Sequence, residues 1–289
     1  MKYPPVIIIG MGRSGTSILT QLLSKLGLFV GKKISPATYE ALFFQELNKW
    51  LLAACGGGLN NPRCISWLLE NNQVKTIVTD FIRFVLRTPK VISFLGLKRY
   101  LAYGTPEQLR IPWGWKDPRT TFTLPIWLAI FPDAKVVHVH RHGVDVANSL
   151  KVRYDGIVSL VRRRREKYGR LYHLFWLMRR LPRRTELFDL RACTLEGGFS
   201  LWEEYVAEAK KHVESLGNRA FEVRFEHLME DPIEVLRSTA AFCELGVSEA
   251  SLLQVISSLR KERAYAYRSS EELRSFARNV AERLERYGH

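Results

Sequence analysis

A glycine-rich segment close to the N-terminus has the residue types that bind phosphate. It reads Gly10-Met11-Gly12-Arg13-Ser14-Gly15-Thr16-Ser17, and it separates a β-branched run, Val6-Ile7-Ile8-Ile9, from apolar residues at helical spacing. A turn of this kind presents unpaired backbone N–H groups and the positive end of the helix dipole to an anion. The glycines allow close approach, and the hydroxyls of Ser14, Thr16 and Ser17 add donors. We predict phosphate binding here, with an unliganded tight turn as the alternative.

The loop departs at one position from the phosphate loop of nucleoside triphosphatases. Gly10 and Gly15 have the separation of G-x-x-x-x-G-K-[ST], but Thr16 occupies the place of the lysine. No apolar strand ending in an aspartate is present to hold magnesium, so transfer of a γ-phosphate would lack two of its charge-stabilising groups. A cation does occur inside the loop, at Arg13. The pattern indicates a ligand whose 5'-phosphate carries one further terminal group. It does not indicate a triphosphate that is bridged by a metal ion.

Further cations stand at or just after the ends of expected strands. Lys116 and Asp117 stand in Trp113-Gly114-Trp115-Lys116-Asp117-Pro118-Arg119, where a buried structural pair is the alternative. Arg141 follows the expected strand at 136–139, and Ser149 comes eight residues later. Arginine offers a bidentate fork to phosphate oxygens, and serine adds a short neutral donor. A fourth segment, 224–232, is interpreted as structural because its Asp-Pro end suits a helix start.

These four segments resemble the sulfotransferase superfamily, in particular bacterial members whose first loop reads G-x-x-R-S-G-T-S. The resemblance implies a donor, 3'-phosphoadenosine 5'-phosphosulfate. Its 5'-phosphosulfate end would be held by Gly12, Arg13, Ser14, Gly15, Thr16 and Ser17. Arg141 and Ser149 would bind the 3'-phosphate, and Lys116, in a K-D-P-R element, would reach the transferring sulfuryl group. Arg13 and Lys116 would then stabilise the charge that builds up during transfer, with no metal required.

Sulfuryl transfer also needs a base that takes the proton of the acceptor hydroxyl. Pro36-Ala37-Thr38-Tyr39-Glu40 lines up with an aromatic–Glu pair in related bacterial sequences, so Glu40 is the predicted base. An ordinary glutamate in the first turn of a helix is the alternative. The histidine element of many eukaryotic relatives is missing, because Pro118 occupies its position. The other candidates for the base are Glu46, Asp117, His138, His140 and His142.

The sequence does not define a metal site. His138 and His140 alternate on an expected strand and could share one face, but a third ligand is not defined, so we expect packed histidines. The four cysteines have neither C-x-x-C spacing nor disulfide density, which predicts reduced, mostly buried thiols in a cytoplasmic protein. Trp202 falls where relatives place an aromatic near the nucleotide, and we expect it to pack in the core.

The segments that position these residues alternate between strand and helix. Strands are expected at 6–9, 113–116, 136–139 and 220–225, and the alternating pattern of the last indicates a sheet edge. Helical patterns fill most of the rest, with a stop at Gly27. This predicts an α/β fold of the P-loop-like, three-layer type, with a mostly parallel central sheet flanked by helices. We expect a single domain over 1–289, with helical insertions at about 35–109 and a basic insertion at about 151–195.

The net charge of +15, from 44 lysines and arginines against 29 acidic residues, implies an anionic partner. Residues 151–191 hold 13 of these basic residues and 4 acidic ones, and they flank the apolar stretch 171–178. Such a segment suits a helix on an anionic membrane surface, at the inner face of the membrane for a cytoplasmic protein. A lid over a polyanionic acceptor and a solvated helix packed by its apolar side are the alternatives. Nucleic acid is not expected, because no recognised binding module is present.

The motifs together predict a sulfotransferase that modifies a hydroxyl of a small-molecule, saccharide or lipid acceptor. The acceptor stays open, since the middle insertions would shape its pocket. One alternative is a P-loop nucleotide kinase or hydrolase, against which Thr16 in place of lysine argues. The other is a non-catalytic, membrane-associated nucleotide-binding module, against which the presence of both Arg13 and Lys116 argues. The sequence leaves the oligomeric state open.

Overall fold

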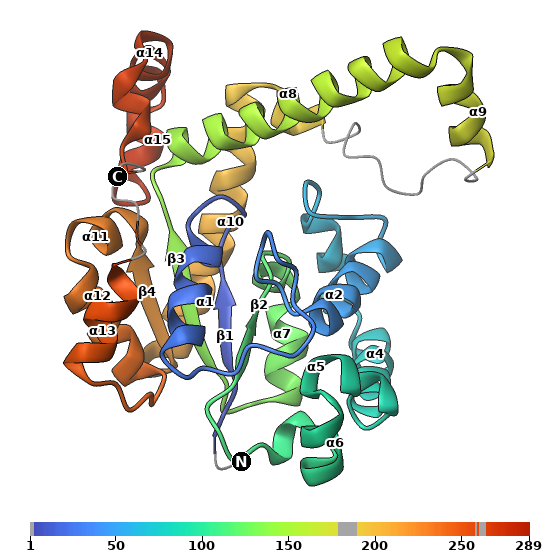
Figure 1. Cartoon of the computed structure of the whole chain (residues 1–289), viewed down its shortest axis with the longest axis vertical. Coiled ribbons are helices and arrows are strands. Elements are labelled where there is room, and N and C mark those ends of the chain that lie inside the picture. The colour runs from blue at the N-terminus through green and yellow to red at the C-terminus, as the bar shows by residue number, and fades with distance from the viewer. Residues whose placement is uncertain (1–2, 179–189, 258, 260–263) are drawn as a thin grey trace. The chain divides into compact units, whose positions relative to one another are not determined.

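The strands expected from the sequence form one parallel sheet in the computed structural model (Figure 1). The structure describes residues 3–178, 190–257, 259 and 264–289. In this part of the chain the sheet has the order β2-β1-β3-β4, with β1 (Val6–Ile9), β2 (Gly114–Lys116), β3 (Lys135–His140) and β4 (Ala220–Arg224). β4 lies at an edge, as its alternating pattern predicted. The chain has the α/β fold with a parallel central sheet that its sequence indicated.

The helices belong to two compact units of the chain. The first unit, Met1–Arg141 and Tyr205–Ala264, contains the sheet. Its α-helices are α1 (Thr16–Lys25), α2 (Leu42–Ala54), α3 (Ser66–Glu70), α4 (Asn72–Leu86), α5 (Ile92–Leu95), α6 (Leu97–Tyr103), α7 (Thr120–Ile130), α11 (Phe225–Glu230), α12 (Pro232–Phe242) and α13 (Glu249–Ile256). The second unit, His142–Glu204 and Tyr265–His289, contains α8 (Gly143–Tyr168), α9 (Arg170–Met178), α14 (Glu271–Asn279) and α15 (Ala281–Glu285). α10 (Leu195–Leu216) begins in the second unit and ends in the first.

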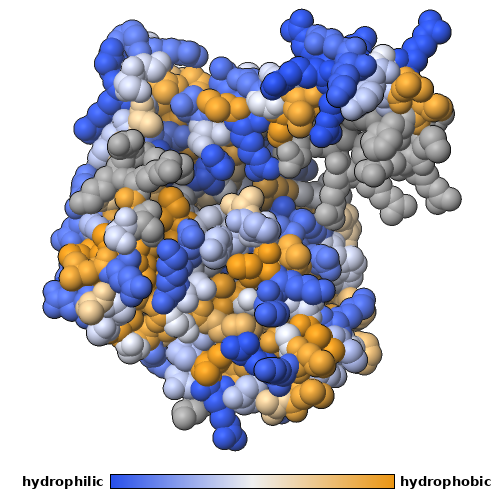
Figure 2. Space-filling model, in the orientation of Figure 1, coloured by the Kyte–Doolittle hydropathy of each residue, from blue (hydrophilic) through white to orange (hydrophobic). Residues whose placement is uncertain are grey.

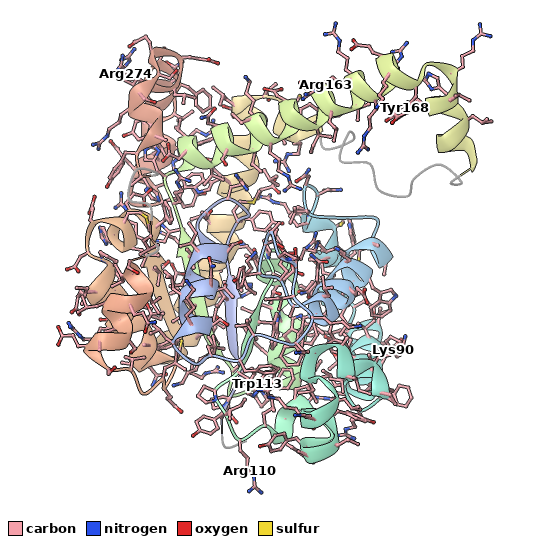
Figure 3. The ribbon with its side chains drawn as sticks, in the orientation of Figure 1. Lys90, Arg110, Trp113, Arg163, Tyr168 and Arg274 are labelled. Carbon is pink, nitrogen blue, oxygen red and sulfur yellow. The ribbon has the colours of Figure 1, made fainter. Side chains whose placement is uncertain are left out.

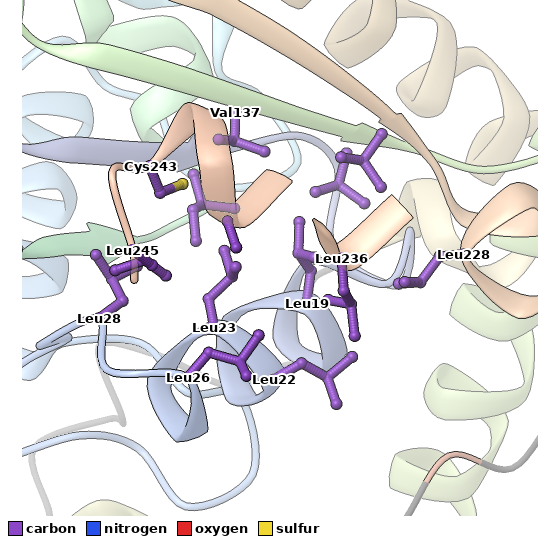
Figure 4. Packing of buried hydrophobic residues seen from close by; sticks show 14 of the residues in the cluster. Leu19, Leu22, Leu23, Leu26, Leu28, Val137, Leu228, Leu236, Cys243 and Leu245 are labelled. Carbon is purple, nitrogen blue, oxygen red and sulfur yellow. The ribbon is translucent and has the colours of Figure 1, made fainter. Parts of the chain in front are cut away.

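The central sheet is covered on both faces, which explains why every residue of β1 is apolar and buried. On one face, Val6 and Ile8 join a cluster with the leucines of α1. Figure 4 shows this cluster, in which Leu19 of α1 lies beside Leu236 of α12. The helical spacing of the α1 leucines thus produces a single buried side.

Aromatic side chains pack on the opposite face of the sheet. Phe44 of α2 stacks on Trp115 of β2, with ring centroids 4.0 Å apart and the rings 4° from parallel. Trp127 of α7 contacts these two rings edge-on, at 5.3 and 5.1 Å. Aromatic pairs of this kind contribute both buried area and a preferred geometry. They fix α2, which carries polar residues of the site described below, against β2.

Helix α8 is buried only near its start. Its buried residues end at Leu150, and the residues from there to Tyr168 are half-buried or exposed. In Figure 3, Arg163 and Tyr168 extend from this part of the helix. The arginines at 179–180 and 183–184, which the sequence places after the apolar stretch, lie outside the described residues. None of the described helices is long and apolar enough to cross a membrane.

Local sequence signals mark most of the element ends correctly. α1 ends before Gly27, and Asp231 caps α12 by accepting the backbone N–H of Glu234 at 3.2 Å. The charged C-terminal segment forms two helices, α14 and α15, on either side of Val280. The expectation of mostly buried thiols is wrong, because Cys243 is the one buried cysteine and the other three are half-buried. Burial raises the pKa of Cys243 to about 12.

Gly10 and Gly15 are required by the packing of the loop itself. Gly10 has a φ of +127°, and a Cβ there would lie 2.2 Å from the carbonyl oxygen of Val139. Gly15 has a φ of +93°, and a Cβ there would lie 2.2 Å from the Phe225 ring. Gly12 has more room, because a Cβ there would lie 4.0 Å from its nearest neighbour, an atom of Pro118. Packing among the described residues therefore explains two of these glycines and leaves Gly12 unexplained.

Gly15→Ala is expected to destabilise the fold, whereas Gly12→Ala in the same loop is not. Alanine at position 15 combines an unfavourable backbone conformation with a clash against Phe225, at a cost of about 1–3 kcal/mol. Gly12→Ala should change the free energy of unfolding by less than about 0.5 kcal/mol. Urea denaturation of the two variants measures the difference, and equal midpoints would contradict the packing seen at Phe225.

Candidate active site

Two loops meet where strands β1 and β2 end. The strands are parallel neighbours with Ile8 opposite Lys116, so loops 10–15 and 117–119 leave the sheet at the same edge. Pro118 lies 4.0 Å from a Cβ built on Gly12. The backbone N–H of Gly10 also donates to the Thr121 hydroxyl at 3.1 Å and ties the first loop to α7. The first loop and the K-D-P-R element, which are far apart in sequence, therefore lie together.

The first loop has the features of an anion site. α1 begins at Thr16, and neither a capping side chain nor an acidic residue of its first turn occupies the N-terminus. The Ser14 side chain is fully buried, and its hydroxyl has no hydrogen-bond partner among the residues that the structure describes. A buried hydroxyl in this state costs free energy unless a ligand or water satisfies it. Arg13, with a φ of 76°, is exposed, and Thr16 is buried.

Ser17 connects α1 to the segment that carries Glu40. Its hydroxyl donates to the Thr38 carbonyl at 2.8 Å, so Ser17 would have to exchange this partner to donate to a ligand. Glu40 lies before α2, which starts at Leu42, and its side chain is buried. The alternative of an ordinary first-turn glutamate is therefore wrong.

Glu40 and Lys116, the predicted base and stabiliser, form a buried ion pair. Lys116 Nζ lies 3.2 Å from Glu40 Oε1, and Lys116 is only 2% exposed. Arg119 Nη1 lies 3.6 Å from Glu40 Oε2 and 2.8 Å from Asp117 Oδ1. Burial raises the pKa of Glu40, but Lys116, Gln45 and Arg119 together outweigh it and hold the pKa below its usual 4.5. Burial lowers the pKa of Lys116, and the charges of Glu40 and Asp117 oppose this effect.

Two residues of α2 fix the orientation of the Glu40 carboxylate. Gln45 Nε2 donates to Glu40 Oε2, and Gln45 Oε1 accepts from Lys49 Nζ at 2.5 Å. Because an ammonium group can only donate, Lys49 holds the amide oxygen of Gln45 on its own side and turns the NH₂ group toward Glu40. Gln45 thus holds one carboxylate oxygen and Lys116 the other. Glu46, a further candidate for the base, is exposed.

Asn48 joins α2, the K-D-P-R element and α7. Its buried amide nitrogen donates to Asp117 Oδ2 at 3.0 Å and to Thr120 Oγ1 at 2.9 Å. Its oxygen accepts from Thr123 at 2.7 Å and from Trp127 at 2.8 Å. These contacts use both donors and both acceptor positions of the amide. Asp117, whose pKa is raised by burial, is held in this network and has a structural role.

Phe225 lies between the first loop and Arg141. The guanidinium carbon of Arg141 is 4.8 Å from the centre of the Phe225 ring, and the same ring leaves no room for a side chain at Gly15. A cation–π contact orients a guanidinium without using its N–H donors. Ser149 lies in α8 of the second unit, so its pairing with Arg141 stays a prediction.

The histidines considered as base or metal ligands are packed. His138 is fully buried with Nδ1 2.8 Å from Glu222 Oε1, and the His140 ring stacks beside it at 5.4 Å. Burial lowers the pKa of His140 to about 3, and His138 adds to the effect. His142, in the second unit, stacks on Tyr267 at 4.2 Å. Within the described ranges, no three His, Cys, Asp or Glu side chains are grouped so that they could hold a metal ion.

Sequence reasoning missed Gln45, Asn48 and Lys49, which hold the predicted residues in place. Their spacing of three and four residues is a signal that could have found them, because it puts three polar side chains on neighbouring positions of a mostly apolar helix. Arg119 was part of the K-D-P-R element but had no role assigned. Nothing in the sequence indicated its contact with Glu40, since that contact joins segments 79 residues apart.

Two residues of the second unit, Asp145 and Trp202, have structural roles. Asp145 accepts the backbone N–H groups of Ala266 and Tyr267 at 3.2 and 2.7 Å and so holds the C-terminal segment on α8. Trp202 is fully buried and contacts Phe199, with ring centroids 5.0 Å apart, which confirms core packing.

Asn48→Ala is expected to destabilise the first unit strongly. It would leave Asp117, Thr123 and Trp127 with buried polar atoms that lack their partner, at a cost of about 2–4 kcal/mol. Thermal or urea unfolding measures this, with Asn72→Ala on the exposed side of α4 as the matched control. Similar unfolding midpoints for both variants would contradict a central role of Asn48.

Gln45→Leu is expected to raise the pKa of Glu40, because the amide no longer donates to the carboxylate. A folded-state pKa below the unfolded value contributes stability above about pH 4.5, and this contribution is lost as the pH falls through the folded-state pKa. In Gln45→Leu the loss should begin at a higher pH. Unfolding curves at successive pH values test this against Gln254→Leu, an exposed control in α13. An unchanged pH profile would show that Gln45 does not act on Glu40.

Comparison with known proteins identifies the family. A model of the sulfotransferase family matches residues 4–249. The sulfotransferase domain from the curacin biosynthetic pathway is 15% identical, with 96% of this chain and 98% of that chain covered and a TM-score of 0.49. The sulfotransferase from Alicyclobacillus acidocaldarius is 20% identical, with 98% and 94% covered and a TM-score of 0.46. Sulfotransferase STF9 from Mycobacterium avium is 16% identical, with 100% and 78% covered and a TM-score of 0.47. Comparison with curated proteins finds no match. Because the family match spans most of its length, this chain belongs to the sulfotransferase family and is a sulfotransferase.

Proposed function

We propose that this enzyme takes a sulfuryl group from 3'-phosphoadenosine 5'-phosphosulfate and transfers it to a hydroxyl, with Glu40 as the base. The observation that carries the proposal is the buried ion pair of Glu40 and Lys116 at the sheet edge where the first loop also lies. A base, a cation and an anion site in one place are the groups that sulfuryl transfer needs. The family supplies the reaction type, and the donor and the residue roles are our inference.

The residues of the first loop fit the phosphosulfate end of this donor. Ser14 supplies a buried hydroxyl that has no protein partner in the described part of the chain. The open space at Gly12 gives an anion access to the backbone, and the uncapped N-terminus of α1 adds its dipole. We assign the 5'-phosphosulfate end to Gly12, Arg13, Ser14, Gly15, Thr16 and Ser17, and the 3'-phosphate to Arg141 and Ser149.

The transfer exchanges one sulfur–oxygen bond for another. The acceptor oxygen attacks sulfur in line while the bond from sulfur to the bridging oxygen of the 5'-phosphate breaks. That oxygen leaves with the electron pair, as part of adenosine 3',5'-bisphosphate, and the proton of the acceptor hydroxyl passes to Glu40. Ser14 and the N-terminus of α1 stabilise the charge on the departing phosphate. Arg13 and Lys116 stabilise the charge on the sulfuryl oxygens.

Lys116 links the donor to the base. Its partner in the structure is Glu40 Oε1, at 3.2 Å. A sulfuryl group next to Lys116 would bring a second negative charge near Glu40. Like charges raise the pKa of a carboxylate, so the bound donor would make Glu40 a stronger base. The acceptor that Glu40 deprotonates is, in our proposal, a hydroxyl of a small alcohol, a saccharide or a lipid.

Two variants with different expected effects test this assignment. Glu40→Gln should bind adenosine 3',5'-bisphosphate like the wild type in calorimetry, while turnover of the donor falls about 10²–10⁴-fold.

Gly12→Ala should weaken binding of the bisphosphate about tenfold or more, because its methyl group enters the space assigned to the anion. Gly246→Ala is the matched control, since a Cβ there meets nothing within 4 Å. Turnover is followed with sulfur-labelled donor and cell extract, and sulfated products are identified by mass spectrometry.

Two outcomes would overturn the proposal. The first is a preference of the purified chain for ATP with magnesium over adenosine 3',5'-bisphosphate. The second is unchanged turnover in Glu40→Gln, which would remove Glu40 as the base. A thermal unfolding curve for each variant ensures that a loss of turnover does not come from a loss of folding.

A further inference from the structure

Helix α4 exposes a continuous apolar face. Val74, Ile77, Phe81 and Phe84 recur at three and four residues, and they are 40%, 68%, 46% and 66% exposed. Trp50 of α2 extends this face, because its ring lies 5.2 Å from that of Phe81 and is 41% exposed. We call these five residues the α4 face. Single exposed apolar residues are ordinary, but a continuous group with several aromatic rings indicates an interaction surface.

Packing of the first unit does not account for the α4 face. The helix buries a different set of residues against the protein, namely Thr79, Ile82, Val85 and Leu86. The apolar side of α4 is therefore wider than its packing against the rest of the first unit requires. The neighbouring helices continue the pattern, since Trp67 of α3 and Leu101 of α6 are each 76% exposed. Figure 2 shows hydrophobic side chains gathered on the lower right of the view, over the region of α4 to α6 in Figure 1.

The segment that contains α4 and its neighbouring helices has an excess of positive charge. Residues 66–103 contain six lysines and arginines and two acidic residues. One of the acidic residues, Asp80, forms an ion pair with Arg83 at 3.0 Å. Lys90 lies at the end of α4 next to α5, as Figure 3 shows. A second copy of this chain would bring the same excess of positive charge to this surface, whereas an anionic surface would be attracted.

Helix α8 of the basic segment 151–191 carries its arginines differently. Arg162-Arg163-Arg164-Arg165 are consecutive on α8, and consecutive helical residues point in directions about 100° apart, so these cations surround the helix. A helix that binds a membrane surface instead separates an apolar side from a basic side. On α4 the exposed apolar residues form one group and Arg83 and Arg87 are exposed beside it in the sequence, whereas at residues 162–165 the cations of α8 face every direction.

We propose that the α4 face docks this enzyme on an anionic lipid bilayer. The aromatic rings and Ile77 enter the boundary between headgroups and acyl chains, where tryptophan and phenylalanine are favourable. The lysines and arginines of residues 66–103 pair with anionic headgroups. The proposal is independent of the donor and of the base, because it concerns a surface outside the residues assigned to catalysis.

Co-sedimentation with vesicles tests the docking without any turnover. The wild type should bind vesicles of phosphatidylglycerol and phosphatidylcholine at low salt and bind phosphatidylcholine vesicles far more weakly. Ile77→Ser/Phe84→Ser should lower the partition coefficient for the anionic vesicles about tenfold or more. The matched control is Val152→Ser/Leu253→Ser, which changes two exposed helical residues elsewhere and should bind like the wild type. Thermal unfolding of both double variants confirms that they are folded.

Four results would overturn the proposal. Ile77→Ser/Phe84→Ser could bind anionic vesicles as well as the wild type does. Neutral vesicles could bind as tightly as anionic ones, which would remove the role of the basic residues. Light scattering could show that the wild type is a dimer and that Ile77→Ser/Phe84→Ser is a monomer. If neither protein then bound vesicles, the α4 face would join two copies of the chain. Replacement of residues 162–165 by glutamine could abolish binding that the α4 variants retain, which would place the contact on α8.

Discussion

The buried ion pair between Glu40 and Lys116 is the interaction on which the arrangement of the active site depends. Removing two charges from water costs several kcal/mol for each ion, and their attraction compensates only if the geometry is good and the remaining polar atoms are hydrogen-bonded. Here Gln45 and Arg119 contact the second carboxylate oxygen, and Lys49 fixes the Gln45 amide. The ion pair therefore requires α2 and β2 to hold a fixed relative position.

That position is held by two kinds of contact on the same helix. Phe44 stacks on Trp115, the residue before Lys116, and so brings α2 against β2 at the point where the cation emerges. One turn further along α2, Asn48 binds Asp117, the residue after Lys116. Aromatic packing sets the distance between the two elements, and the buried amide selects one register. The residues that position the proposed base thus come from the core of the fold.

The first loop is constrained in a similar way by Phe225. Its ring fills the space beside Gly15 and lies under the guanidinium of Arg141. One apolar side chain from the start of α11 therefore contacts both segments that we assign to the two ends of the donor. This explains why the segment after β4, whose own residues make no assigned contact with a ligand, still bears on the site. It also explains why Gly15 and Gly12 differ, since packing requires only the first of them.

The sequence by itself determined the strands, the parallel sheet and the segments that carry chemistry, because these follow from local patterns: β-branched runs, a glycine turn before a helix and cations after strands. It also identified Glu40 and Lys116 as functional candidates, through their resemblance to a family. Only the tertiary structure decided that these two side chains touch, that Gln45, Asn48 and Arg119 hold them, and that α4 keeps an uncovered apolar face. The contacts of residue 40 with 116 and of residue 48 with 117 depend on how helices pack on the sheet. A hydrophobic pattern cannot tell a buried apolar side of a helix from an exposed one.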